Sequence, residues 1–297
     1  MTALLLGALG LTLSLVVPGI LAGARWPDRA PAAAVVLWQA ITLTGVLCAL
    51  GVVLAGPEEL VRVIGTGRPV ATAALAGALA VAAVIVIRLL VSLAGVSRRS
   101  RSRRERHRTL VDLLDRAEQR RGLDHEGLRV LDGALPVAYC VPGRSPRVVL
   151  SDGALRVLDD AQVAAVLAHE QAHLRHRHEV VMESFTAFYR AVPRPLRSRA
   201  PLDAVHLLLE MVADDVARRR CGAGPLRAAL ERLTESMDGG AAAGGEADRE
   251  RRLARLGGTG SSAVTVLAAV AAVCLLVLPT VILVLPWLDR ALGTWPL

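Results

Sequence analysis

The sequence predicts a mainly helical membrane protein in which four membrane-spanning helices bracket an inserted α+β domain. Hydrophobic residues make up 53% of the 297 residues, and they gather in four blocks, residues 2–23, 32–55, 70–96 and 262–288. Each block is long enough for a helix that crosses the hydrocarbon core of a bilayer, which takes about 20 residues. Residues 97–261 carry most of the charge and mix helical with β-rich patterns, so they predict one folded domain; residues 289–297 form a short tail.

The four apolar blocks are nearly free of charge. Only Arg88 interrupts them, and we expect its side chain to snorkel toward the membrane surface. The first block has an alternative, because residues 22–24 resemble the small-residue cleavage site of a signal peptide. No basic residue precedes that block, and it is longer than the apolar core of most signal peptides. We therefore expect a retained helix rather than a cleaved leader.

A cluster of arginines sets the expected orientation in the membrane. It follows the third block and consists of Arg98, Arg99, Arg101, Arg103, Arg104, Arg106 and Arg108. The positive-inside rule places such a cluster in the cytosol, against anionic lipid. We therefore expect a multi-pass protein of the cell membrane with residues 97–261 in the cytosol. The net charge of +8 could instead indicate nucleic acid, but no aromatic residues are interleaved with the cluster, so no direct nucleic-acid binding is expected.

Short elements open the inserted domain. Residues 108–121 have apolar residues at helical spacing and predict a helix. Residues 128–131, 137–141 and 148–150 are β-rich and are separated by Asp-Gly and Pro-Gly turn signals. They predict three short strands.

Two longer helices follow these strands. The first can be capped by Asp159 or Asp160 and is expected to run to about residue 192, where prolines end it. The second is expected to begin at Pro201 and to run to about residue 220, before a glycine. Residues 238–247 are rich in glycine and alanine and predict a flexible loop, and residues 247–256 predict a short basic helix.

The first of these helices carries the motif His-Glu-Gln-Ala-His at residues 169–173. Two histidines four residues apart on a helix face the same side, so their ring nitrogens can meet on one metal ion. Glu170 lies beside the first histidine, where it can take a proton from a water molecule. This H-E-x-x-H pattern is typical of zinc peptidases, and it predicts one zinc ion held by His169 and His173 with Glu170 as the catalytic base.

A catalytic zinc site needs a third protein ligand, and the second helix offers one. Glu210 and Asp214 are four residues apart and face the same side, so Glu210 can bind the metal while Asp214 supports a ligand histidine. Asp215 is the alternative for either role. The competing interpretation is that these carboxylates are simply the solvated face of an amphipathic helix. The presence of His169 and Glu170 favours the ligand role.

A cation that stabilises the transition state is also expected. The candidates are His206, one turn before Glu210, and Arg252 in the predicted basic helix. The alternative for both is a solvated surface group. We expect His176 and His178 on the surface rather than at the metal.

The H-E-Q-A-H motif, the Glu210 and Asp214 pair and the strand at residues 148–151 resemble the integral-membrane gluzincin peptidases. The closest likeness is to the protease unit of the BlaR/MecR antibiotic-sensing transducers, and the HtpX/Ste24 group is more distant. In the transducers the first motif often continues to an aspartate where this chain has His178, so the role of that position is open. The resemblance also implies that an extended substrate pairs with the strand at residues 147–151.

The resemblance implies a zinc-dependent endopeptidase that cleaves a protein or peptide substrate near the cytosolic membrane face. It implies regulated signalling, for example by cleavage of a cytosolic transcriptional repressor. Two alternatives remain, an HtpX-like protease for membrane-protein quality control and a catalytically silent membrane receptor or scaffold.

Overall fold

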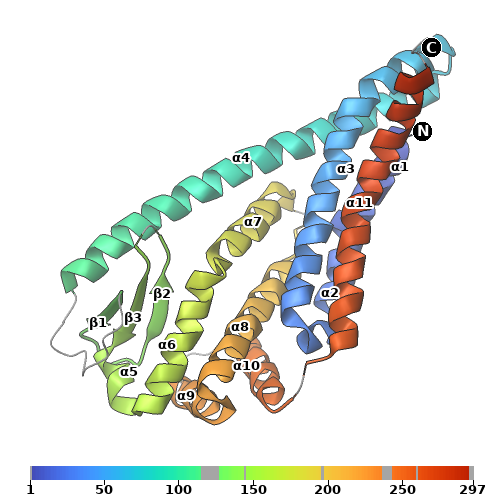
Figure 1. Cartoon of the computed structure of the whole chain (residues 1–297). Helices are drawn as coiled ribbons and strands as arrows, with labels where there is room; N and C mark the ends of the chain where they lie inside the picture. Colours follow the sequence, from blue (N-terminus) through green and yellow to red (C-terminus); the bar gives the residue numbers. More distant parts are fainter. Residues whose placement is uncertain are drawn as a thin grey trace. The chain divides into compact units, whose positions relative to one another are not determined.

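The computed structural model describes residues 2–114, 127–143, 145–194, 197–235, 243–258 and 260–293, which are mostly helical with one small mixed sheet (Figure 1). The chain divides into two compact units. The helical unit comprises Met1–Gly95, Phe185–Val205 and Ser261–Leu297, and the sheet unit comprises Val96–Ser184 and His206–Gly260. Residues 185–205, which the sequence places in the inserted domain, therefore pack with the apolar helices.

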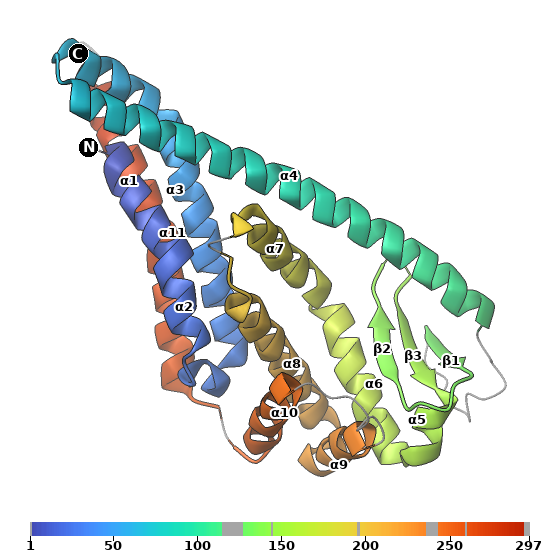
Figure 2. The ribbon, with the colours of Figure 1, turned by 180° about the vertical axis from the view of Figure 1, so that it is seen from behind.

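The helical unit is built around α3 (Pro31–Gly65), which lies alongside α1 (Thr2–Leu11) and α11 (Ser262–Gly293) (Figures 1 and 2). Between α1 and α3 the chain forms a π-helical segment η1 (Thr12–Val16), α2 (Val17–Ala22) and a single 3-10 turn η2 (Trp26–Arg29). The helix does not stop at residue 55, the expected end of the second span. The helix α3 continues through Pro57 to Gly65, into a stretch that was expected to be a loop.

Four helices are long and apolar enough to cross a membrane by length and composition: Ala3–Ala22, Pro31–Gly65, Pro69–His107 and Ser262–Ile282. Their outer faces expose large hydrophobic side chains. Val70 is 81% exposed, Leu54 71% and Leu267 69%. Contiguous apolar surface of this kind is unfavourable in water and favourable in lipid. The structure therefore agrees with the membrane protein that the four apolar blocks predict.

The third span is part of one continuous helix, α4 (Pro69–Leu114). The sequence predicted a span that ends at residue 96 and a separate helix from residue 108. No glycine or proline lies between residues 96 and 114, and arginine is a good helix former, so nothing interrupts the helix at the membrane boundary. Residues 115–121 of the predicted helix lie outside the described residues.

Arg88 of α4 has a hydrogen-bond partner that the sequence did not predict; its snorkelling toward the membrane surface stays a prediction. Its Nε donates a hydrogen bond to the carbonyl of Ala191, at 2.8 Å, in the last turn of α7 (His178–Ala191). Ser92, one turn further along α4, donates to the carbonyl of Ala187, at 2.7 Å. Carbonyls in the last turn of a helix lack partners within the helix. Arg88 therefore satisfies a carbonyl at the end of α7, and Ser92 adds a second hydrogen bond between α4 and the same helix one turn earlier.

The sheet unit contains the three predicted strands, β1 (Leu128–Leu131), β2 (Ala138–Val141) and β3 (Arg147–Ser151). The strand order is β1-β3-β2, with β1 parallel and β2 antiparallel to β3. After the short helix α5 (Asp152–Val157), the chain enters α6 (Asp160–Arg175). Buried residues of β1 and β3 pack against α6 in one core, which fixes that helix on the sheet; they include Leu128, Val130, Leu150, Val163, Val166 and Leu167.

Three further helices complete the sheet unit. The helix α8 (Ala200–Cys221) lies within a residue of its predicted bounds. The helix α9 (Ala223–Glu235) was not predicted; it follows Gly222, which has a φ of +86° and marks the turn between the two helices. The helix α10 (Ala243–Leu256) begins inside the predicted loop at residues 238–247. Residues 238–242 of that loop lie outside the described residues.

Candidate metal centre

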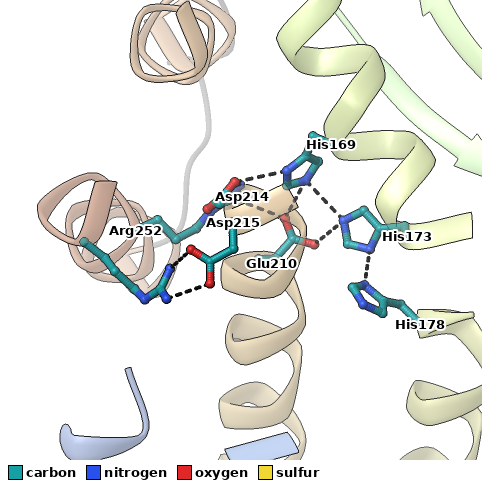
Figure 3. A network of polar contacts seen from close by, with 8 residues as sticks. His169, His173, His178, Glu210, Asp214, Asp215 and Arg252 are labelled. Atoms are coloured by element: carbon teal, nitrogen blue, oxygen red, sulfur yellow. Dashed lines mark hydrogen bonds and ion pairs between the residues drawn. The ribbon is translucent and has the colours of Figure 1, made fainter. Parts of the chain in front are cut away.

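The helix α6 presents both histidines of the motif on one face. Asp159 caps the helix: its side chain accepts a hydrogen bond from the backbone of Gln162, whose own side chain accepts one from the backbone of Asp159. His169 lies about three turns after Asp159, and His173 lies about four turns after it. Their Nε2 atoms lie 3.1 Å from each other (Figure 3).

Glu210 of α8 completes a triangle with these histidines. One carboxylate oxygen lies 3.4 Å from His169 Nε2, and the other lies 3.3 Å from His173 Nε2. Beside the site, Ala172 of α6 packs with Ala213 and Val216 of α8 in one buried apolar cluster. The structure thus brings together the three side chains that the sequence proposed as ligands.

The spacing of these atoms fits zinc. Three ligands at about 2.0–2.1 Å from one tetrahedral zinc ion lie about 3.3–3.4 Å from one another. The Nε2 atoms of His169 and His173 are 3.1 Å apart, and each lies 3.3–3.4 Å from a different oxygen of Glu210, so the carboxylate spans the two rings at close to this distance. Two imidazoles and a carboxylate are also the donor set of thermolysin-like zinc sites. His169, His173 and Glu210 can therefore hold one zinc ion.

Asp214 lies beside the other ring nitrogen of His169, Nδ1, which does not belong to this triangle. Its carboxylate lies 3.0 Å from His169 Nδ1, although not in the line of a regular hydrogen bond. Arg252 of α10 binds both oxygens of Asp214 at 2.8 Å and reaches Glu210 at 3.0 Å. Asp215, the alternative for either role, instead pairs with Arg255 at 2.6 and 2.7 Å. The structure places Asp214, not Asp215, beside the histidine.

These contacts shift the pKa values of the residues concerned. Burial opposes the charged form of His169, but the nearby carboxylates of Asp214 and Glu210 outweigh it and raise its pKa to about 9. Burial would raise the pKa of Glu210, yet contacts with His169, His173 and Arg252 hold that pKa well below its usual range. Glu210 is therefore ionised, as a metal ligand must be.

The predicted long helix through residue 192 is wrong, and the break has a consequence for the site. Arg177 has a φ of +51°, in the left-handed region, so α6 ends at Arg175 and α7 starts in a new direction at His178. His178, expected on the surface, is only 5% exposed. Its Nδ1 lies 2.8 Å from Nδ1 of His173 (Figure 3). His176 is exposed, as expected.

The contact between His178 and His173 determines which ring nitrogens carry protons. Burial and the nearby histidines lower the pKa of His178 to about 3, so this ring is neutral. When Nε2 of His173 faces a metal ion, its proton sits on Nδ1. The Nδ1–H of His173 then donates a hydrogen bond to Nδ1 of His178. The neutral His178 ring therefore carries its own proton on Nε2. A neutral imidazole thus occupies the place that the resemblance assigns to an aspartate.

Glu170 lies beside the triangle on α6 and is half-buried. Burial raises the pKa of its carboxyl more than the charges of His169 and His173 lower it. Cys140 of β2 contacts Glu170, and burial together with this carboxylate raises the pKa of the thiol to about 12, so the thiol stays protonated. A carboxylate with a raised pKa is suited to accept and release a proton.

The two candidate cations differ. Arg252 lies in the site, but Asp214 and Glu210 hold its guanidinium. His206 is exposed on α8, one turn before Glu210, and forms no hydrogen bond or ion pair with any residue that the structure describes. Its role stays a prediction.

The expected pairing of substrate with residues 147–151 is wrong. The strand β3 is the central strand, and both of its edges are already paired, with β1 and with β2. Strand order cannot be read from local sequence patterns, which show only that a segment is a strand. Among the described residues, β2 has one edge without a neighbouring strand; this strand contacts α6 and carries Cys140 beside Glu170.

Comparisons with known proteins match this part of the chain. The model of peptidase family M48 matches residues 100–208, a range that contains both histidines and ends two residues before Glu210. The chain is 37% identical over 76 residues to the Protease HtpX homolog of Acidiphilium cryptum (strain JF-5), which covers 25% of this chain and 26% of that protein. It is 33% identical over 86 residues to the Protease HtpX homolog of Pelotomaculum thermopropionicum, which covers 28% and 30%. No solved structure gives a significant match.

The matches span less than a third of the length of these relatives. They support similarity to membrane metallopeptidases of the M48 type and do not single out the BlaR/MecR transducers, which the motifs were expected to resemble most. The segment that carries the sheet and both histidines is therefore similar to peptidase family M48.

Proposed function

We propose that this chain is a membrane-bound, zinc-dependent endopeptidase that hydrolyses peptide bonds of a protein substrate near the cytosolic face of the membrane. The triangle of His169, His173 and Glu210 at the spacing of a tetrahedral zinc site carries this proposal. The adjacent Glu170 supports a hydrolytic rather than a purely structural site. A catalytically silent receptor would have no need of that carboxylate.

The side chains divide the work of hydrolysis. Zinc, when bound, supplies a Lewis acid that acidifies water and polarises a carbonyl. The Glu170 carboxylate takes a proton from the attacking water and delivers it to the nitrogen of the leaving amine. Asp214 and His178 hold the rings of His169 and His173 in the tautomers that turn each Nε2 lone pair toward the triangle.

An extended substrate is expected to add to the edge of β2 rather than to β3. Strand addition needs a free row of backbone groups, and β2 offers one beside α6. A peptide along this edge passes Cys140 and hence Glu170. The backbone of the substrate would thus be fixed before its scissile carbonyl meets the catalytic residues.

Two biological roles fit this chemistry. The similarity to proteins named Protease HtpX homolog favours membrane-protein quality control. Regulated signalling, with a cytosolic repressor as substrate, is favoured by the three apolar helices before the domain and one after it, the arrangement behind the likeness to the transducers. Cross-linking with the inactive Glu170→Gln protein in cells distinguishes the roles by the captured substrate, a membrane protein or a soluble repressor.

The test of the activity is metal analysis combined with proteolysis of an unfolded protein such as casein by the full chain in detergent. Glu170→Gln keeps one zinc per chain but loses about 10²-fold or more in rate, because the general base is gone. His173→Ala loses the zinc. His176→Ala, a matched change at an exposed histidine, keeps both zinc and rate. Undiminished cleavage by Glu170→Gln, or full zinc content in His173→Ala, would reject the proposal.

A further inference from the structure

The helical unit contains a cavity of about 100 Å³ that the peptidase chemistry does not use. Its walls come from η1, α2, α3, the second half of α7 and the start of α8, all of which belong to this unit. Most of the lining is apolar, including Leu15, Pro18, Phe188 and Leu202. A water molecule needs roughly 10–15 Å³ on such a measure, so the cavity has room for a group the size of a phosphate.

Trp38 of α3 stands in the wall of this cavity with an unsatisfied donor. The residue is only 1% exposed, and its ring packs edge-on against Phe185, with the ring centres 6.2 Å apart. Among the described residues, no acceptor forms a hydrogen bond with its buried Nε1. A buried N–H without a partner is unfavourable, and indole can only donate. A ligand with an acceptor oxygen would satisfy this N–H, since no described residue does.

Arg197 also lines this cavity, carries a positive charge and has an unpaired donor of its own. Its Nη2 donates to the carbonyls of Arg190 and Val192, each at 3.0 Å, and its guanidinium lies 4.9 Å from the centre of the Tyr189 ring. Its Nε is buried and forms no hydrogen bond within the described residues, and no described carboxylate pairs with it. The charge is held in place but is not neutralised.

The location of the cavity indicates where its ligand comes from. Trp38 lies seven residues after α3 begins, roughly 10 Å along a helix that is apolar enough to cross a membrane. Tryptophan, tyrosine and arginine typically meet lipid headgroups at such depths. A ligand at this place must offer acceptor oxygens and negative charge to one end of the cavity and an apolar body to the rest.

We propose that this cavity binds an anionic phospholipid, with phosphate oxygens on Trp38 Nε1 and Arg197 Nε and the start of an acyl chain along the apolar wall. Phosphate oxygens are strong acceptors for arginine, and they can also accept a hydrogen bond from an indole N–H. A free phosphate ion would satisfy the same donors but would leave the apolar wall uncovered. The proposal does not depend on the peptidase activity, since none of these residues belongs to the metal centre.

The experiment is native mass spectrometry of the delipidated full chain in a neutral detergent. The titrants are 1-palmitoyl-2-oleoyl phosphatidylglycerol, the phosphatidylcholine with the same chains, and glycerol phosphate. We expect the first to bind about tenfold or more tightly than the second, because only it lacks a choline cation to oppose Arg197. Glycerol phosphate is expected not to bind in the same range. Equal binding of the two lipids, or binding of glycerol phosphate at the same strength, overturns the proposal.

Two variants locate the site. Trp38→Phe keeps the packing against Phe185 but removes the N–H, and Arg197→Gln removes the charge; each is expected to weaken phosphatidylglycerol binding about tenfold or more. Trp26→Phe and Arg194→Gln are the matched controls away from the cavity lining, and both are expected to bind as the unaltered chain does. If Trp38→Phe fails to fold, Arg197→Gln against Arg194→Gln decides alone. Unchanged binding in Arg197→Gln overturns the assignment.

Discussion

The two ligand histidines are supported in different ways. On one side, Nδ1 of His169 faces the carboxylate of Asp214, which Arg252 holds by both oxygens. On the other side, Nδ1 of His173 meets the neutral ring of His178. An ionised acceptor close to a ring N–H attracts its proton more strongly than a neutral acceptor does. His169 is therefore the better electron donor to a metal ion. Zinc affinity can still be raised by strengthening the support of His173.

The first prediction concerns the charged side. Asp214→Asn keeps the size of the side chain but removes its charge, and it is expected to weaken zinc binding about 10- to 100-fold, the usual loss when the carboxylate behind a ligand histidine is removed. The measurement is competition for zinc with a chromophoric chelator. Asp215→Asn is the matched control, because Asp215 pairs with Arg255 and does not touch a histidine. Equal losses in the two variants would contradict the role of Asp214.

A second prediction concerns the guanidinium that holds Asp214. Arg252→Lys keeps the positive charge but cannot bind both oxygens of Asp214 and also reach Glu210, since an ammonium group lacks the planar fork. Zinc affinity is expected to fall about three- to tenfold, less than in Asp214→Asn, because the change acts one residue further away. Arg255→Lys is the same change on the neighbouring pair and should leave zinc affinity unaltered. A large fall in kcat with unchanged zinc affinity would instead favour transition-state stabilisation by Arg252.

The charged side of the site could be predicted from the sequence, whereas the neutral side could not. Glu210 and Asp214 are four residues apart on one helix, and that spacing alone places both carboxylates on one face. The position of His178 depends on Arg177, a residue without the usual sequence signals of a helix end. The apolar spacing continues past it, so the pattern predicted one helix where there are two.

The same distinction applies to the fold. Elements defined by local patterns, such as the three strands and α8, were predicted within a residue or two. Features defined by packing were not. The order of the strands, which leaves β2 rather than β3 with a free edge, depends on contacts between segments that are distant in the sequence. So does the capture of the α7 carbonyls by Arg88 and Ser92.

The third prediction turns to the neutral side. His178→Ala removes the acceptor that faces Nδ1 of His173, and it is expected to weaken zinc binding about three- to tenfold, because a neutral hydrogen bond contributes less than a charged one. The loss should be smaller than in Asp214→Asn when both are measured by the same chelator competition. His176→Ala is the control, since His176 is exposed and stacks on the His178 ring, so its loss leaves the acceptor that faces His173 in place. A loss as large as that of Asp214→Asn would mean that the two sides are equivalent.

The smallest expected effect has the opposite sign. His178→Asp places a carboxylate at the start of α7, where a negative charge also suits the positive end of the helix dipole. If this carboxylate faces Nδ1 of His173, both histidines are then supported by charged acceptors, and zinc affinity is expected to rise about threefold. His178→Asn, which has the same shape without the charge, should not produce this gain. A lower affinity in His178→Asp than in the unaltered chain would show that the buried imidazole is itself the better support, through its fit rather than its charge.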